Sequence, residues 1–178
     1  MISEKLIQSC RKMHREAQRE VYEIMGPILF RTCKRYLKKE EEIEDVLAEV
    51  FFTLFTKLDQ LREDYAFEAW ARTITVNQCL LRLRRQVNFN IYIEESNVDS
   101  AHSTQPDSGI QEEDLLKLLD ILPEGCRTVF NLYAIEGYGH KEISEQLGIS
   151  EGTSKSQLNV ARTKLQNLVN VHYYRQAK

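Results

Sequence analysis

The sequence predicts an all-α protein made of two small helical domains joined by a flexible linker. Hydrophobic residues recur at three- and four-residue spacing through most of the chain, which is the period of a helix with one buried face. Residues 88–110, NFNIYIEESNVDSAHSTQPDSGI, lose this period and collect Asn, Ser, Asp, Pro and Gly, as linkers do. We therefore expect one domain at 1–87 and a second at 111–178.

Three segments of the first domain have helical patterns. Pro27 predicts a helix that starts there and runs over 27–37, because its missing N–H would be unpaired in a first turn anyway. The stretch DQLREDYAFEAW breaks the periodicity and indicates a polar loop, after which 67–86 form a third helix. The clearest stripe lies between these two helices and consists of Ile43, Val46, Leu47, Val50, Phe51, Leu54, Phe55 and Leu58.

Composition limits the class of protein. A 178-residue chain that is 42% hydrophobic is not wholly disordered. Its apolar stretches are far shorter than the ~20 residues that span a bilayer, and MISEKLIQSCRK does not resemble a secretory signal. We therefore expect a cytoplasmic protein without membrane insertion. The four cysteines form no CxxC pair, which favours free buried thiols over disulfides or zinc, and we expect no cofactor.

Charge is distributed in blocks of one sign. Residues 1–39 carry ten Lys and Arg against four Glu, whereas 40–49 carry six acids and no base. A basic segment with Arg72, Arg82, Arg84 and Arg85 follows, and 94–114 then hold seven acids and no base. Such blocks suggest separate surfaces for separate partners, and ordinary solvated helix faces are the alternative. The acidic span predicts either a mimic of nucleic acid or a plain solvated tether.

The stretch HKEISEQLGISEGTSKSQLNVARTKL predicts two helices separated by a turn at Gly148. Glycine adopts the left-handed conformation that ends a helix without steric cost. Ile149 would then return to the core, and the Ser150 hydroxyl would cap the second helix by accepting from the N–H of Thr153. This is the pattern of a helix-turn-helix, whose second helix presents its first residues to the major groove. A purely structural helical hairpin is the alternative.

Residues around this turn are the candidates for contact with duplex DNA. No acid follows Glu151, and an all-basic segment favours phosphate binding. His140 would either touch DNA or simply lie near the start of the first helix. The expected contacts are Lys141, Ser150, Thr153, Ser154, Lys155, Gln157 and Arg162, with Thr153, Ser154 and Gln157 nearest the base edges.

The chain resembles the ECF-type sigma factors, the smallest class of bacterial RNA polymerase sigma subunits. Residues 122–166, from LPEGCRTVFNLY to NVARTKLQ, resemble region 4 of that family. Residues 21–85 are similar to region 2, with the EDV..EVF core, the F.AW start of the next helix and the I.VN within it. Two signatures in this order, with a linker between them, are far more specific than a lone helix-turn-helix.

The resemblance implies a binding subunit without catalysis of its own. Region 2 would bind the clamp coiled coil of core RNA polymerase and open the minus-ten element, with a flipped base accepted by the loop 62–67. Region 4 would bind the beta flap and read the minus-thirty-five element. By position, the polymerase contacts would be Asp45, Leu47, Glu49 and Phe52, and the minus-ten contacts Tyr65, Asn77, Arg82, Arg84 and Arg85. Members of the family are commonly held inactive by an anti-sigma factor, although no residue here indicates one.

Some positions depart from the family pattern. Ala48 replaces a common Gln in the clamp-binding helix, and Gln157 and Val160 stand where basic residues are frequent.

Other classes of protein are the alternatives. A free-standing helix-turn-helix regulator would explain residues 122–178 but leaves the region 2 match to chance. An enzyme finds no support, because the histidines are scattered and no phosphate-binding loop or nucleophile motif occurs.

Overall fold

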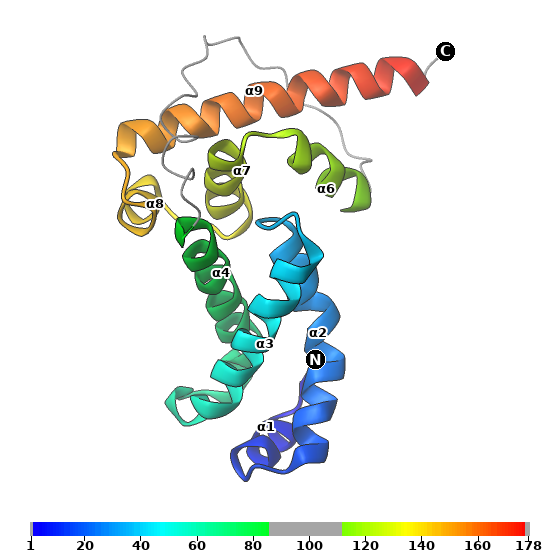
Figure 1. Ribbon diagram of the computed structural model, residues 1–178, viewed down its shortest axis with the longest axis vertical. Coiled ribbons are helices and arrows are strands. Elements are labelled where there is room, and N and C mark those ends of the chain that lie inside the picture. The colour runs from blue at the N-terminus through cyan, green and yellow to red at the C-terminus, as the bar shows by residue number, and fades with distance from the viewer. Residues whose placement is uncertain (1, 86–111, 177–178) are drawn as a thin grey trace. The chain divides into compact units, whose positions relative to one another are not determined.

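The computed structural model describes residues 2–85 and 112–176 and divides the chain into two compact units, Met1–Leu83 and Arg84–Lys178. Every regular element in the described residues is helical (Figure 1). The all-α class is thereby confirmed. The predicted linker at 88–110 lies outside the described residues, so its flexibility and the role of its acids stay predictions.

Four helices form the first unit: α1 (Glu4–Arg11), α2 (Arg15–Lys34), α3 (Glu40–Thr56) and α4 (Phe67–Arg85). α2 packs against both α1 and α3. Two single 3-10 turns, η1 (Leu58–Gln60) and η2 (Asp64–Ala66), lie in the segment predicted as a polar loop. The predicted stripe is confirmed from Ile43 to Leu54, which are buried in α3, whereas Phe55 is half-buried and Leu58 is buried beyond the helix, in η1.

The predicted helix start at Pro27 is wrong, because α2 begins twelve residues earlier and Pro27 lies inside it. A proline in a helix interior lacks the N–H donor and costs about 3 kcal/mol. The apolar face of α2 continues on both sides of it, with Val21 and Met25 before and Leu29 and Cys33 after, all fully buried. Packing of this continuous face outweighs the local penalty.

The second unit contains α6 (Glu112–Ile121), α7 (Glu124–Phe130), a π-helical turn η3 (Asn131–Ile135), α8 (His140–Leu147) and α9 (Glu151–Gln176). α9 packs against α6, α7 and α8, as Figure 1 shows. Val160 is part of this packing, which explains why a basic residue is absent there. The buried cluster consists of Leu119, Leu122, Cys126, Val160, Ala161 and Leu165.

The four cysteines are free and buried, as predicted. Burial, with a smaller contribution from Glu20, raises the pKa of the Cys10 thiol to about 11, so this thiol stays protonated at neutral pH. Within the described residues, no three His, Cys, Asp or Glu side chains are grouped as a metal site would require. None of the described helices has the length and apolar character needed to cross a membrane.

Candidate polymerase and nucleic-acid interfaces

The turn between α8 and α9 has the predicted geometry. Gly148 adopts φ 69° and ψ 34°, and its N–H donates to the carbonyl of Ser144 at 2.9 Å, which ends α8. The backbone N–H of Thr153 donates to Oγ of Ser150 at 2.9 Å. The left-handed glycine and the serine cap are therefore both confirmed. Ile149, expected to return to the core, is half-buried.

Cationic and polar side chains remain accessible around this turn. Lys141, Ser150, Lys155 and Arg162 are exposed, and Thr153 is half-buried. Lys155 lies 3.7 Å from a carboxylate oxygen of Glu151 one turn earlier, and the Arg162 guanidinium lies over a tyrosine ring. Both contacts are at the surface, so the two cations are still available to an external anion.

Two of the residues predicted to meet base edges are buried instead. Ser154 is 0% exposed, and its Oγ lies 2.9 Å from Nδ1 of His140. Gln157 is 2% exposed, and its Oε1 accepts a hydrogen bond from Sγ of Cys126 at 2.7 Å. Their burial argues against direct contact with base edges, because they share the inward face of α9 with Ala161. Gln157 lies four residues and Ser154 seven residues before Ala161, and this helical spacing was the signal that could have shown their burial.

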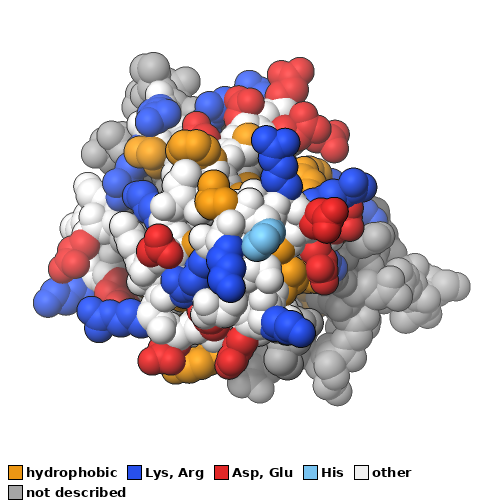
Figure 2. All heavy atoms as spheres, turned by 90° about the horizontal axis from the view of Figure 1, so that it is seen from below, with side chains coloured by type: hydrophobic (Ala, Val, Ile, Leu, Met, Phe, Trp, Pro, Cys, Tyr) orange, Lys and Arg blue, Asp and Glu red, His pale blue; other side chains and the backbone are white. Residues whose placement is uncertain are grey.

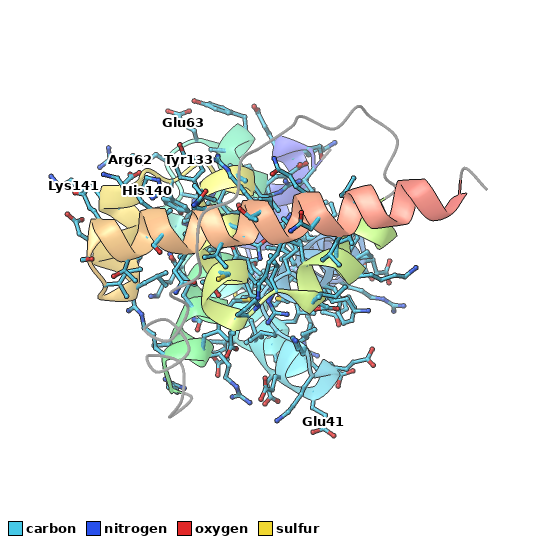
Figure 3. The ribbon with its side chains drawn as sticks, turned by 90° about the horizontal axis from the view of Figure 1, so that it is seen from above. Glu41, Arg62, Glu63, Tyr133, His140 and Lys141 are labelled. Carbon is cyan, nitrogen blue, oxygen red and sulfur yellow. The ribbon has the colours of Figure 1, made fainter. Side chains whose placement is uncertain are left out.

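His140 is part of the packing between α8 and α9. Its ring stacks on Tyr133, with centroids 4.7 Å apart and planes inclined by 25° (Figure 3). Burial is the main cause that lowers the pKa of His140, and the charge of Lys155 acts in the same direction. Of the two roles that the sequence left open, these contacts favour the structural one.

One face of α3 presents acids and an aromatic ring to solvent. Asp45 and Glu49 are exposed, and Phe52 is 71% exposed. The spacing of four and then three residues places them along one side of the helix. Leu47, predicted with them, is only 9% exposed and lines a groove of about 340 Å³ beside α2, so it belongs with the packing residues. This burial favours a packing role for Leu47 over the predicted polymerase contact.

The minus-ten candidates divide between the loop before α4 and α4 itself. Tyr65 is 79% exposed at the loop. Asn77, Arg84 and Arg85 are exposed on α4, whereas Arg82 is half-buried and donates from Nη2 to Oδ2 of Asp45 at 3.3 Å. The structure thus pairs a residue predicted to meet DNA with one predicted to meet polymerase.

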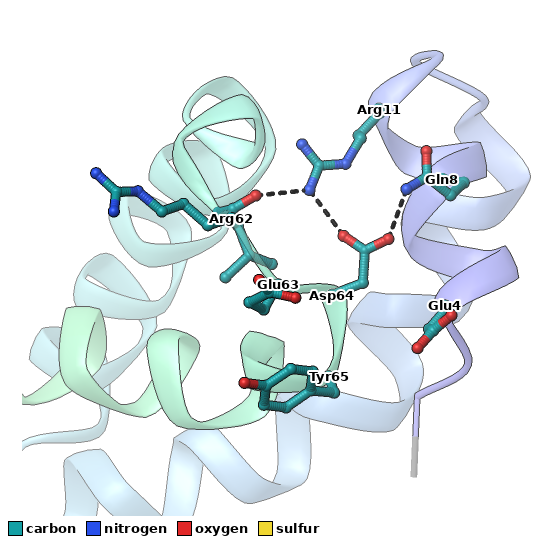
Figure 4. A pocket seen from close by; sticks show the side chains of 8 residues that line it. Glu4, Gln8, Arg11, Arg62, Glu63, Asp64 and Tyr65 are labelled. Carbon is teal, nitrogen blue, oxygen red and sulfur yellow. Dashed lines mark hydrogen bonds and ion pairs between the residues drawn. The ribbon is translucent and has the colours of Figure 1, made fainter.

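A cluster that sequence reasoning missed lies where α1 meets the loop between α3 and α4 (Figure 4). Arg11 and Gln8 both donate hydrogen bonds to the carboxylate of Asp64. The hydrogen bond from Arg11 is the main cause that lowers the pKa of Asp64. No motif marked these residues, because the two segments are separated by about fifty positions in the chain.

Basic and acidic side chains are interspersed on the face drawn in Figure 2, and hydrophobic side chains reach it only in small groups. This face therefore does not show one large area of a single sign. The charge blocks of the sequence form smaller surface areas, such as the acidic side of α3.

Comparison with protein families gives two matches. Residues 21–88 match the model "Sigma-70 region 2", and residues 112–165 match "Sigma-70, region 4". Together they include most of both described units, in the order that the sequence predicts. A helical unit followed by a helix-turn-helix unit, with these matches, defines an RNA polymerase sigma factor, a class of non-catalytic transcription initiation factor.

Similar proteins specify the group within this class. The chain is 25% identical over 178 residues to the ECF RNA polymerase sigma factor SigW of Bacillus subtilis, covering 93% of this chain and 95% of SigW. It is 28% identical over 141 residues to the ECF RNA polymerase sigma-E factor of Escherichia coli K12, covering 72% and 74% of the two chains. The chain belongs to the ECF sigma factors and directs promoter-specific transcription initiation by RNA polymerase.

Solved structures share the fold. CnrH in complex with the cytosolic domain of CnrY superimposes with a TM-score of 0.51 at 22% identity, covering 93% of this chain and 96% of that one. The sigma factor RpoE, in complex with the anti-sigma factor NepR from Bartonella quintana, gives 0.51 at 21% identity, covering 89% and 99%. At these identities the likeness establishes the fold.

Proposed function

We propose that the domain at 1–87 binds the clamp coiled coil of core RNA polymerase through the exposed side of α3. Asp45 and Glu49 supply negative charge for a basic partner, and Phe52 supplies an apolar anchor at the end of the same row. A largely exposed phenylalanine beside two acids is the observation that carries this assignment. Aromatic side chains that are buried only on association dominate the affinity of many interfaces.

The same domain would open the minus-ten element. Tyr65 would stack on an unpaired base. The strand would then run along α4 and meet Asn77, Arg82, Arg84 and Arg85. Their exposure supports this role, except that Arg82 must first leave Asp45. Base stacking on an aromatic ring contributes roughly 1–3 kcal/mol per base, enough to offset much of the unpairing cost.

The domain at 111–178 would bind the beta flap and read the upstream element in duplex form. The phosphates would be neutralised by Lys141, Lys155 and Arg162, and the base edges would be met by Ser150 and Thr153. Ser154 and Gln157 would contribute indirectly, by holding α9 against α8 and α7. This division follows from which side chains the fold leaves exposed.

The protein would work in the cytoplasm without a cofactor or catalysis of its own, and an anti-sigma factor would be its third partner. Both solved structures described above are complexes, one with the cytosolic domain of CnrY and one with the anti-sigma factor NepR. The exposed rows on α3 and α9 would then be the surfaces for which such a partner competes.

Runoff transcription with core polymerase lacking sigma tests the proposal. Wild type should give promoter-dependent transcripts, and Glu49→Lys should weaken co-purification with core while the helical circular dichroism is kept. Glu41→Lys, at another exposed position of α3, controls for the change in charge. A free-standing regulator would instead bind duplex DNA alone and leave core polymerase inactive. Equal co-purification of Glu49→Lys and wild type would show that α3 is not the polymerase contact.

A further inference from the structure

The first helix, α1, lies outside the residues that the region 2 model matches, yet it is bonded to the loop between α3 and α4. Arg11 donates from Nη1 to the carbonyl of Leu58 at 2.9 Å and from Nη2 to the carbonyl of Leu61 at 2.9 Å. Nη2 also donates to Oδ1 of Asp64 at 2.7 Å. One guanidinium therefore joins three points of the loop.

Additional bonds reinforce this connection. Gln8 donates to the second carboxylate oxygen of Asp64, and the N–H of Ile2 donates to Oε1 of Glu68 at 3.2 Å. The side chains of Arg11 and Asp64 are only 19% and 12% exposed, so their pair is screened less than a surface pair. Charge-assisted bonds of this kind are short and directional, and they hold a loop in one conformation.

Tyr65 follows the anchored Asp64 directly and lines two open cavities to which α1 also contributes. One cavity of about 480 Å³ is lined by Glu4 and Gln8 of α1 together with Arg62 and Tyr65 of the loop (Figure 4). The other, of about 640 Å³, is lined by Ser3 and Glu4 together with Tyr65 and with residues of α4. Both volumes are in the range of small-ligand sites.

We propose that α1 is a positioning element for minus-ten recognition, and that Arg11 fixes the loop so that Tyr65 and the adjoining cavity meet the unpaired base in one geometry. The proposal rests on the function proposed above and extends it to residues outside the matched region. Arg11 is a positioning residue, because it reaches the DNA only through the loop. A residue that merely stabilised the fold would change the melting temperature and leave base preference unchanged.

The test uses holoenzyme reconstituted with full-length variants and a fork-junction DNA library. The library has a duplex upstream portion and a randomised single-stranded overhang across the minus-ten positions, and the bases retained by holoenzyme are sequenced. Arg11→Ala should bind core as wild type does but lose about tenfold in preference at one overhang position, the size of one stacked base. Arg19→Ala is the matched control, since Arg19 forms an exposed ion pair with Glu23 one turn later on α2.

Arg11→Lys and Gln8→Ala keep the proposal testable if Arg11→Ala fails to fold. Lysine retains the charge facing Asp64 but lacks the planar fork that reaches two carbonyls, so an intermediate loss of preference is expected. If these variants fold and their holoenzymes retain the same bases in the overhang as wild type does, the proposal is overturned. A wild-type holoenzyme without preference at any overhang position would instead contradict the proposed function itself.

Discussion

Arg82 of α4 and Asp45 of α3 form a hydrogen-bonded ion pair, with Nη2 and Oδ2 3.3 Å apart. The pair joins the helix proposed to bind DNA to the helix proposed to bind polymerase. Because both side chains are partly exposed, the pair contributes at most about 1 kcal/mol to stability. A polymerase that engages Asp45 would therefore release Arg82 for DNA at low cost.

Asp45→Asn should raise the affinity of the free protein for single-stranded DNA, because Arg82 loses its competing carboxylate. The free energy of unfolding should change by less than about 1 kcal/mol. Fluorescence anisotropy with a labelled oligonucleotide measures the affinity, and Glu41→Gln removes the same charge elsewhere on α3. An equal increase in the two variants would mean that only net charge matters.

Phe52→Ala and Leu47→Ala should separate binding from stability on one helix. Phe52 is mostly exposed, so its truncation should change the free energy of unfolding by less than about 0.5 kcal/mol. Its loss should nevertheless weaken core binding by roughly 2 kcal/mol if it is an interface anchor. Leu47→Ala should destabilise the fold by about 2–5 kcal/mol. Chemical denaturation and titration with core polymerase supply the two measurements, and full core affinity in Phe52→Ala would contradict the assignment.

Gln157→Ala and Lys155→Ala should have opposite signatures on α9. Removal of the buried amide leaves the Cys126 thiol without this acceptor and should destabilise the second unit by about 1–3 kcal/mol. Lys155→Ala should leave stability nearly unchanged, weaken binding to all sequences and reduce the salt slope by about one charge. Holoenzyme affinities at several salt concentrations decide this. A change in base preference in folded Gln157→Ala would restore the role that burial argues against.

The difference between these two neighbours shows how far the sequence could be interpreted. Gly148, Ser150 and the stripe of α3 were predictable because a turn conformation, a cap and a helical period depend on local chemistry. The inward face of α9 was indicated by the spacing of Gln157 from Ala161, but the hydrogen bond from Cys126 of α7 joins segments that are distant in the chain and was not predictable. The bond between Arg11 and Asp64 is likewise tertiary and leaves no periodic signal, and Pro27 was misplaced because packing on both sides outweighs its local preference.

Acidification should destabilise the second unit through His140. Its pKa is lowered in the folded protein, so the unfolded chain takes up the proton first. The stabilising contribution is therefore present above the unfolded value of about 6.5 and is lost as pH falls through the lower folded value. The melting temperature of His140→Gln should fall less over this range than that of wild type. His14→Gln, at the exposed start of α2, serves as the control, and identical pH profiles for all three proteins would contradict the prediction.

Gly148→Val should disrupt the turn between α8 and α9. With φ at 69°, a side chain at this position is strained by about 1–2 kcal/mol, and a β-branched one by more. Promoter binding should fall together with the melting temperature. Gly152→Ala is the contrasting change, since Gly152 lies in the first turn of α9 and an added Cβ would meet only ordinary contacts. Equal stability of Gly148→Val and wild type would mean that the turn does not need this conformation.

The buried cysteines allow the opening of each unit to be measured separately, from the rate at which a thiol reagent modifies them. Cys10, Cys33 and Cys79 lie in the first unit and Cys126 in the second, all buried as free thiols. A thiol reagent reaches them only when the surrounding helices separate, so the modification rate at each site reports the opening free energy of its own unit. Peptide mass mapping after timed alkylation would thus show, in the unmodified wild-type sequence, which unit loosens when polymerase, DNA or an inhibitor is added or withdrawn.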